Sequence, residues 1–129
     1  MTATIATEPV VLDSSGWLEY FTFDTKAQSF APYLESDIPL FVPTVVLYEV
    51  RKILFLKQGK TAADIFYSEA LKHIIVPFDE SLALLAVQLS ITFKLSMADA
   101  IIYATSQRYN ARLVTSDAHF ANLPGILML

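Results

Sequence analysis

Residues 9–16 have the sequence PVVLDSSG, a short continuous apolar run that ends at Asp13 and is followed by a turn. A run of this kind is typical of a strand buried on both faces of a parallel sheet. The pattern returns at residues 111–117, ARLVTSD, where a second apolar run precedes Asp117. Sites in open parallel sheets lie beyond the carboxyl ends of the strands, so we predict that Asp13 and Asp117 share one edge of the sheet.

Strands and helices alternate along the rest of the chain. Apolar runs predict further strands at 39–42, 73–78 and 126–129. Helical periodicity and end signals such as Gly59, Asp79 and Ser96 predict helices elsewhere. These helices cover 17–21, 26–34, 43–58, 61–72, 80–93 and 96–109, with a short helical turn at 117–122. The alternation implies a parallel sheet with helices on both faces.

Composition limits the class of protein. The chain has 129 residues, which predicts a single domain over residues 9–129 after a flexible tail at 1–8. Hydrophobic residues make up 54% and charged residues 17%, so we expect an exposed apolar surface that binds a partner or a second copy, as in a homodimer. The chain has no cysteine, which excludes thiolate metal sites and disulfides.

Charge and hydropathy exclude other classes. The net charge of −4 is not that of a general nucleic-acid binder, so a nucleic-acid role needs a local basic patch or a bound metal. Residues 1–9 lack the basic and apolar regions of a secretory signal, and no apolar run has the length of a membrane helix. We therefore expect a cytoplasmic protein without membrane contact.

Four acids, Asp13, Glu49, Asp99 and Asp117, stand where apolar elements end or turn over. Converging carboxylates must be neutralised by protons or a cation, which suggests metal-assisted attack on a phosphodiester. Three of them also have a structural explanation. Asp13 and Asp117 could cap the turns that follow them, and Asp99 completes a capping box with Ser96.

Glu49 is the acid that capping does not explain. On a helical wheel it falls on an otherwise apolar face with Val45, Val46, Ile53 and Leu56. An ionised carboxylate on a core-facing stripe is costly unless it is compensated, for example by Lys52, so a functional role is favoured. The two histidines, His73 and His119, are too few for a histidine-based metal site. For His119, a surface or packing role is favoured over substrate contact.

Four segments in order, VVLDSS (10–15), PTVVLYEV (43–50), SMADAIIYA (96–104) and LVTSDAHF (113–120), resemble a PIN domain. Within that family they resemble the VapC toxins of toxin–antitoxin pairs. The resemblance covers the chain from about residue 10 to its end. It implies a three-layer α/β/α sandwich whose central, mostly parallel sheet has about five strands.

The resemblance also implies roles for individual residues. Asp13 and Asp99 would be direct ligands of Mg²⁺ or Mn²⁺, and Glu49 and Asp117 would act through water or a second ion. These oxygen ligands suit Mg²⁺, which keeps several waters in proteins. Ser14 and Thr115 would supply supporting hydroxyl groups, although strand-end capping is favoured for both.

The implied function is hydrolysis of RNA by a metal-dependent endoribonuclease, the toxin partner of a VapB-like antitoxin. Arg51 and Lys52 could contact RNA, or could belong to an ordinary solvated helix face. An apolar groove that receives the antitoxin is expected between the first helices. Its expected walls are Trp17, Phe21, Phe23, Phe30 and Tyr33, for most of which core packing is the alternative. The alternative functions are a non-catalytic PIN-like interaction module and a PIN nuclease of RNA processing.

Overall fold

The central sheet has five strands in the order β3-β2-β1-β4-β5, and every neighbouring pair is parallel. The computed structural model describes residues 8–129, so the predicted tail lies outside the described residues except for Glu8. The strands are β1 (Val11–Leu12), β2 (Phe41–Pro43), β3 (Ile74–Val76), β4 (Leu113–Thr115) and β5 (Ile126–Met128). The predicted five-stranded, mostly parallel sheet is therefore confirmed, and its strands are parallel throughout.

The order of the strands fixes where a site can form. From β1 the chain moves outward through β2 to β3, then crosses to the other side of β1 to add β4 and β5. Val11 pairs with Phe41 on one side and with Leu113 on the other, so the carboxyl ends of β1, β2 and β4 lie at the same edge. The direction in which successive strands are added to the sheet reverses between β1 and β4, the position where open α/β sheets bind their ligands.

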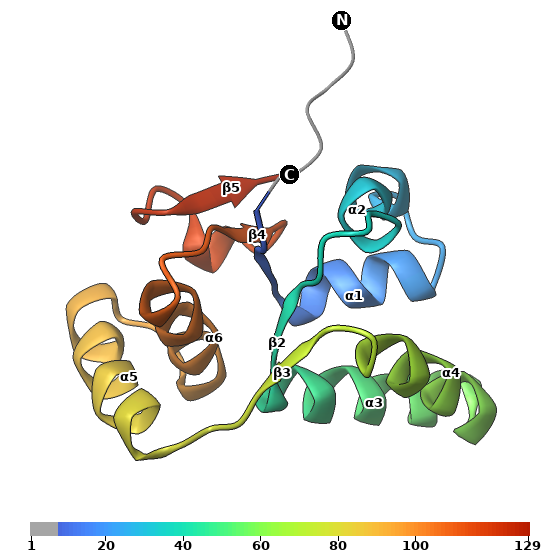
Figure 1. Ribbon diagram of the computed structural model, residues 1–129, viewed down its shortest axis with the longest axis horizontal. Helices are drawn as coiled ribbons and strands as arrows, with labels where there is room; N and C mark the ends of the chain where they lie inside the picture. The colour runs from blue at the N-terminus through green and yellow to red at the C-terminus, as the bar shows by residue number, and fades with distance from the viewer. Residues whose placement is uncertain (1–7) are drawn as a thin grey trace, which may run out of the picture.

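Helices cover both faces of this sheet (Figure 1). In Figure 1, α5 and α6 lie on one side of the strands, and α1 to α4 lie on the other. The helices are α1 (Ser14–Phe21), α2 (Ala27–Leu34), α3 (Thr44–Gln58), α4 (Lys60–Ala70), α5 (Glu80–Phe93) and α6 (Met97–Arg108), with the short η1 (Ala118–Phe120). The predicted α/β/α sandwich is thus confirmed.

Helix α6 is the central helix of the core. All seven residues from 100 to 106 are buried, including Thr105 and Ser106. The hydroxyls of these two residues donate to the carbonyl oxygens of Ile101 and Tyr103, at 2.9 and 2.7 Å, so neither buried hydroxyl lacks a partner. A helix buried on all sides is held firmly, and this fixes the position of Asp99 in its first turn.

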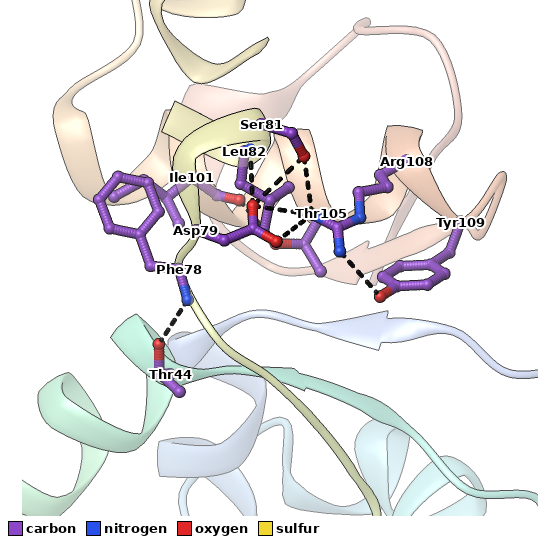
Figure 2. Close-up of polar contacts among 9 residues, drawn as sticks. All are labelled: Thr44, Phe78, Asp79, Ser81, Leu82, Ile101, Thr105, Arg108 and Tyr109. Atoms are coloured by element: carbon purple, nitrogen blue, oxygen red, sulfur yellow. Dashed lines mark hydrogen bonds and ion pairs between the residues drawn. The ribbon is translucent and has the colours of Figure 1, made fainter. Parts of the chain in front are cut away.

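A polar network joins the start of α5 to the end of α6 (Figure 2). Asp79 caps α5, as predicted, by accepting from the backbone N–H of Leu82 at 2.9 Å. Arg108 donates to both carboxylate oxygens of Asp79 at 2.9 Å. The backbone N–H of Phe78 donates to the hydroxyl of Thr44 at 3.2 Å, which connects the same loop to α3.

The expected aromatic groove is only partly correct. Trp17 and Phe30 are completely buried in the core, where the Trp17 ring contacts the rings of Phe21, Phe66 and His73. A groove of about 340 Å³ does lie beside α1, but α3 and α4 supply its other wall. It is lined by Tyr20, Phe21, Phe23, Leu54, Gln58, Ala62 and Ile65.

Apolar side chains also remain exposed, as the composition predicts. On α5 they are Leu84, Val87 and Ile91, and on α3 they include Tyr48, Phe55 and Leu56. Within residues 8–129, no single helix combines the length and apolarity needed to cross a membrane. Helices α5 and α6 pass that test only as a pair, with a bend of 112° between them.

Candidate functional site

The four predicted acids line a single depression of about 340 Å³ at the carboxyl edge of the sheet. Asp13 follows β1, Glu49 lies on α3, Asp99 is in the first turn of α6, and Asp117 follows β4. The depression is also lined by Ser14, Ser15, Tyr48, Lys52, Ile53 and Ile102. The structure therefore brings together four carboxylates that are far apart in the sequence.

Asp13 is the most deeply buried of these acids, with 3% of its surface exposed. Its Oδ1 accepts from the Ser15 hydroxyl at 2.7 Å and from the backbone N–H of Gly16 at 3.2 Å. Its Oδ2 accepts from the Thr115 hydroxyl at 2.7 Å. Burial raises the pKa of Asp13 to about 6, because desolvation outweighs these hydrogen bonds. Asp13 thus caps α1 and also lines the depression.

Glu49 lies on the flank of α3 and not on its core-facing stripe. The buried stripe consists of Val46, Val50 and Leu54, whereas Leu56 is 76% exposed. The predicted apolar face around Glu49 is therefore only partly correct, because Val46 is buried and Val45 packs against the core, whereas Leu56 is exposed. Glu49 is half-buried, and its Oε1 accepts from the Ser14 hydroxyl at 2.6 Å.

Asp99 and Asp117 approach each other beside His119. Nδ1 of His119 lies 3.1 Å from Oδ1 of Asp117 and 3.6 Å from Oδ2 of Asp99. One potential ligand atom from each of the three residues lies within 4.8 Å of the other two. Burial, together with the negative charge of Asp117, raises the pKa of Asp99. His119 lies at the surface, as predicted, with 77% of its side chain exposed. The prediction did not include its contacts with Asp99 and Asp117.

The capping explanation holds for Asp117, whereas at Asp99 only half of the predicted capping box forms. Within residues 8–129 no hydrogen bond joins the Asp99 carboxylate to the Ser96 backbone N–H. The Asp99 N–H donates to the Ser96 hydroxyl at 3.3 Å, the bond expected of an N-cap. Asp117 caps η1 by accepting from the backbone N–H of His119 at 2.9 Å. At Asp13 and Asp117 capping and convergence therefore coexist, because both acids cap a helix start and also line the depression.

The donor set fits a hard divalent cation. Carboxylate oxygens are the ligands that Mg²⁺ and Mn²⁺ prefer. Burial raises the pKa of both Asp13 and Asp99, so ionising these carboxyls without a counter-charge is costly. The tightest group is Asp99, Asp117 and His119, and Asp13 keeps an oxygen, Oδ2, that accepts only one hydrogen bond from the protein.

The remaining predicted residues have different surroundings. Ser14 lines the depression, whereas Thr115 is completely buried and bonds to Asp13 and to the backbone N–H of Asp117 at 2.9 Å. Thr115 therefore has the strand-end capping role that the sequence favours. Lys52 lines the depression. Arg51 instead donates to Oδ1 of Asp64 at 2.9 Å and does not line the depression.

Comparison with known structures supports the fold. A chain from a toxin–antitoxin complex of Klebsiella pneumoniae is 22% identical, with a TM-score of 0.78 over 92% of this chain and 96% of that one. Mycobacterium tuberculosis VapC20, described as a Sarcin-Ricin loop cleaving toxin, is 18% identical, with a TM-score of 0.73 over 87% and 92%. A chain of DNA-bound VapBC from Salmonella typhimurium is 12% identical, with a TM-score of 0.74 over 95% and 98%.

Comparison with the curated proteins gives no match. The family model described as PIN domain matches residues 10–126, which is nearly the whole chain and includes all four acids of the depression. Because this match covers far more than half of the sequence, the chain belongs to the PIN domain family.

Proposed function

We propose that the protein is a metal-dependent endoribonuclease that hydrolyses RNA phosphodiesters and is the toxin of a VapBC-type pair. The observation that carries this proposal is the convergence of Asp13, Glu49, Asp99 and Asp117 on one depression. The structural similarity to a toxin–antitoxin complex and to a toxin that cleaves the Sarcin-Ricin loop supports it.

Asp13, Asp99 and Asp117 would hold Mg²⁺ or Mn²⁺, with His119 beside the last two. The ion would supply neutralising charge, a lowered pKa for water and stabilisation of the reacting phosphate. Thr115 holds Asp13 in place through Oδ2. Glu49, whose Oε1 accepts from the Ser14 hydroxyl, would accept hydrogen bonds from water in the depression.

The proposed protein partner is a VapB-like antitoxin. The groove beside α1 is almost entirely apolar, and side chains such as Phe23, which is 90% exposed, suit an apolar segment of a partner. On α5, Leu84, Val87 and Ile91 are exposed at helical spacing. This second apolar surface supports a homodimer of the toxin.

Calorimetric titration with Mn²⁺ tests the metal site in the wild type and in Asp13→Asn and Asp99→Asn. Asparagine caps helices about as well as aspartate, so these substitutions remove charge and keep the caps. We expect the wild type to bind Mn²⁺ and both variants to lose that binding. A folded wild type that binds no Mn²⁺ would exclude the nuclease and favour the non-catalytic interaction module.

Expression in cells tests the toxin assignment separately. The wild type, expressed without an antitoxin, should arrest growth, and Asp99→Asn should not. Growth at the normal rate with soluble wild-type protein, combined with Mn²⁺ binding, would indicate a PIN nuclease outside a toxin–antitoxin system.

A further inference from the structure

An exposed aromatic ring stands at the mouth of the acidic depression. Tyr48 directly precedes Glu49 on α3, is 64% exposed, and lines the depression with the four acids. Lys52 follows one helical turn later, and its Nζ lies 5.7 Å from the centroid of the Tyr48 ring. Apart from this cation–π contact with each other, neither side chain has a hydrogen bond or an ion pair within residues 8–129, and the Tyr48 ring remains largely exposed to a ligand.

We propose that Tyr48 and Lys52 form a nucleotide subsite, in which the ring stacks on an unpaired base and the ammonium contacts a backbone phosphate. The inference rests on the proposed function, because it places this subsite beside the carboxylates that would act on the scissile phosphate. Aromatic side chains with nearby cations are the general means by which proteins bind single-stranded nucleic acid.

Electrostatics explains why the subsite needs a ring as well as a charge. The chain carries a net charge of −4, and four acids line the depression, so an approaching phosphate is repelled. Lys52 is the only basic residue among those that line it. Arg51, the next basic residue on α3, is paired with Asp64. Stacking on Tyr48 supplies attraction that does not depend on charge.

The geometry also selects the form of the RNA. The bases of a duplex are stacked on each other, and only unpaired nucleotides offer a free base to a protein ring. Tyr48 therefore favours loops, bulges and single strands over paired segments. An exposed tyrosine can instead belong to a protein interface, and Phe55 and Leu56, which line a neighbouring hollow with Tyr48, would share it.

Fluorescence anisotropy tests the subsite with a labelled single-stranded RNA of about 10 nucleotides, within the site size of single-strand binders. All proteins in this measurement also carry Asp99→Asn. Under the proposed function this substitution prevents cleavage of the RNA during the titration. We expect Tyr48→Ala to weaken binding about tenfold, the scale of one base stacked on an aromatic ring. Tyr48→Phe should retain the affinity, because it keeps the ring.

Lys52 is tested through the salt dependence of the same binding. Lys52→Gln should reduce the slope of log Kd against log salt by about 0.7, the value for one phosphate contact on a single strand. Phe55→Ala is the matched control on α3, since Phe55 is 46% exposed and does not line the acidic depression. This control should leave the RNA affinity unchanged.

Several results would overturn the proposal. One is that Tyr48→Ala leaves the affinity for single-stranded RNA unchanged. Another is that Tyr48→Ala weakens binding equally to a fully paired duplex of the same sequence. If Tyr48→Ala and Phe55→Ala both change the molar mass by light scattering but not the RNA affinity, Tyr48 belongs to a protein interface. Mn²⁺ binding by the wild type tests the proposed metal site separately. Tyr48 has no carboxylate to bind the ion, so the result for Tyr48 does not depend on that test. The melting temperature of each variant checks that the fold is intact.

Discussion

The hydroxyl of Thr115 donates a 2.7 Å hydrogen bond to Oδ2 of Asp13, which joins residues 102 positions apart at the carboxyl ends of β4 and β1. The same oxygen of Thr115 accepts from the backbone N–H of Asp117 at 2.9 Å. Thr115 therefore fixes two of the four acids relative to each other, although its own side chain is completely buried and does not line the depression.

Thr115→Val should destabilise the protein by about 1–3 kcal/mol, because it removes the partner of two polar groups without changing the shape of the side chain. Thr115→Ser keeps the hydroxyl and should restore most of this loss. Urea unfolding of both variants measures the difference. Equal stability of Thr115→Val and the wild type would mean that water replaces the hydroxyl at no cost.

The stability of the metal-free protein should fall as the pH rises toward 6. The folded carboxyl of Asp13 keeps its proton up to a pKa of about 6, whereas the unfolded carboxyl releases it near 3.8. The folded state therefore binds more protons between these values. The contribution of Asp13 is complete below pH 3.8 and is lost as the pH passes 6, a change of about 3 kcal/mol. Asp99, whose pKa is also raised, acts in the same direction.

Urea unfolding with a chelator present, repeated across this pH range, measures that loss. Asp13→Asn has no proton to release, so its stability should change less with pH than that of the wild type. Saturating Mg²⁺ should reduce the loss in the wild type, because a bound cation stabilises the ionised carboxylates. A steeper loss for Asp13→Asn would contradict the assignment.

His119→Ala should weaken Mn²⁺ binding by about tenfold, the scale found when a side chain that orients metal ligands is removed. Its Nδ1 lies 3.1 Å from Asp117 and 3.6 Å from Asp99, so its loss affects both carboxylates. His73→Ala is the control for general effects of losing a histidine, because His73 contacts Leu40 and Trp17, away from the depression. Calorimetry of both variants compares the affinities, and equal affinities would assign His119 to the solvated surface.

Gly16→Ala should cost about 1–3 kcal/mol through overpacking. A Cβ at this position would lie 2.8 Å from Cε1 of Phe30 and 2.9 Å from Cγ of Leu12, and both side chains are completely buried. Adding Phe30→Leu to Gly16→Ala makes room for the methyl group and should recover part of the loss. Thermal unfolding of the two single variants and the double variant measures this coupling. If the stability changes of the two single variants simply add in the double variant, the methyl group is accommodated by a shift of the α1 backbone and not by the space at Phe30.

Much of the fold could be predicted from the sequence because its signals are local. The apolar runs before Asp13 and Asp117 became β1 and β4, and Gly59 ends α3 as expected. The edge strand β3 is shorter than predicted, Ile74–Val76 against 73–78. At the edge of a sheet only one side is paired, so apolar residues beyond the paired segment still resemble a strand in sequence.

Convergence of Asp13, Asp99 and Asp117 was predictable from the ends of the elements, and that of Glu49 from its place inside the helix that follows β2, but the surroundings of each acid were not. Which side of α3 meets the core depends on how α3 packs with α4 and α6, so Leu56 is exposed although it falls on the predicted apolar face. The approach of His119 to Asp99 requires the relative placement of η1 and α6. No local pattern contains that information, although the position of His119 two residues after Asp117 was a usable signal.

The position of β1 between β2 and β4 determines when the acidic depression can form during synthesis of the chain. A chain that has emerged from the ribosome only as far as α6 contains Asp13, Glu49 and Asp99, but β1 still has an unpaired side. Thr115 and Asp117 arrive with β4, the strand that closes this gap. Completion of the depression therefore waits for β4, and a truncated product that stops before residue 113 is expected to lack the complete set of four acids.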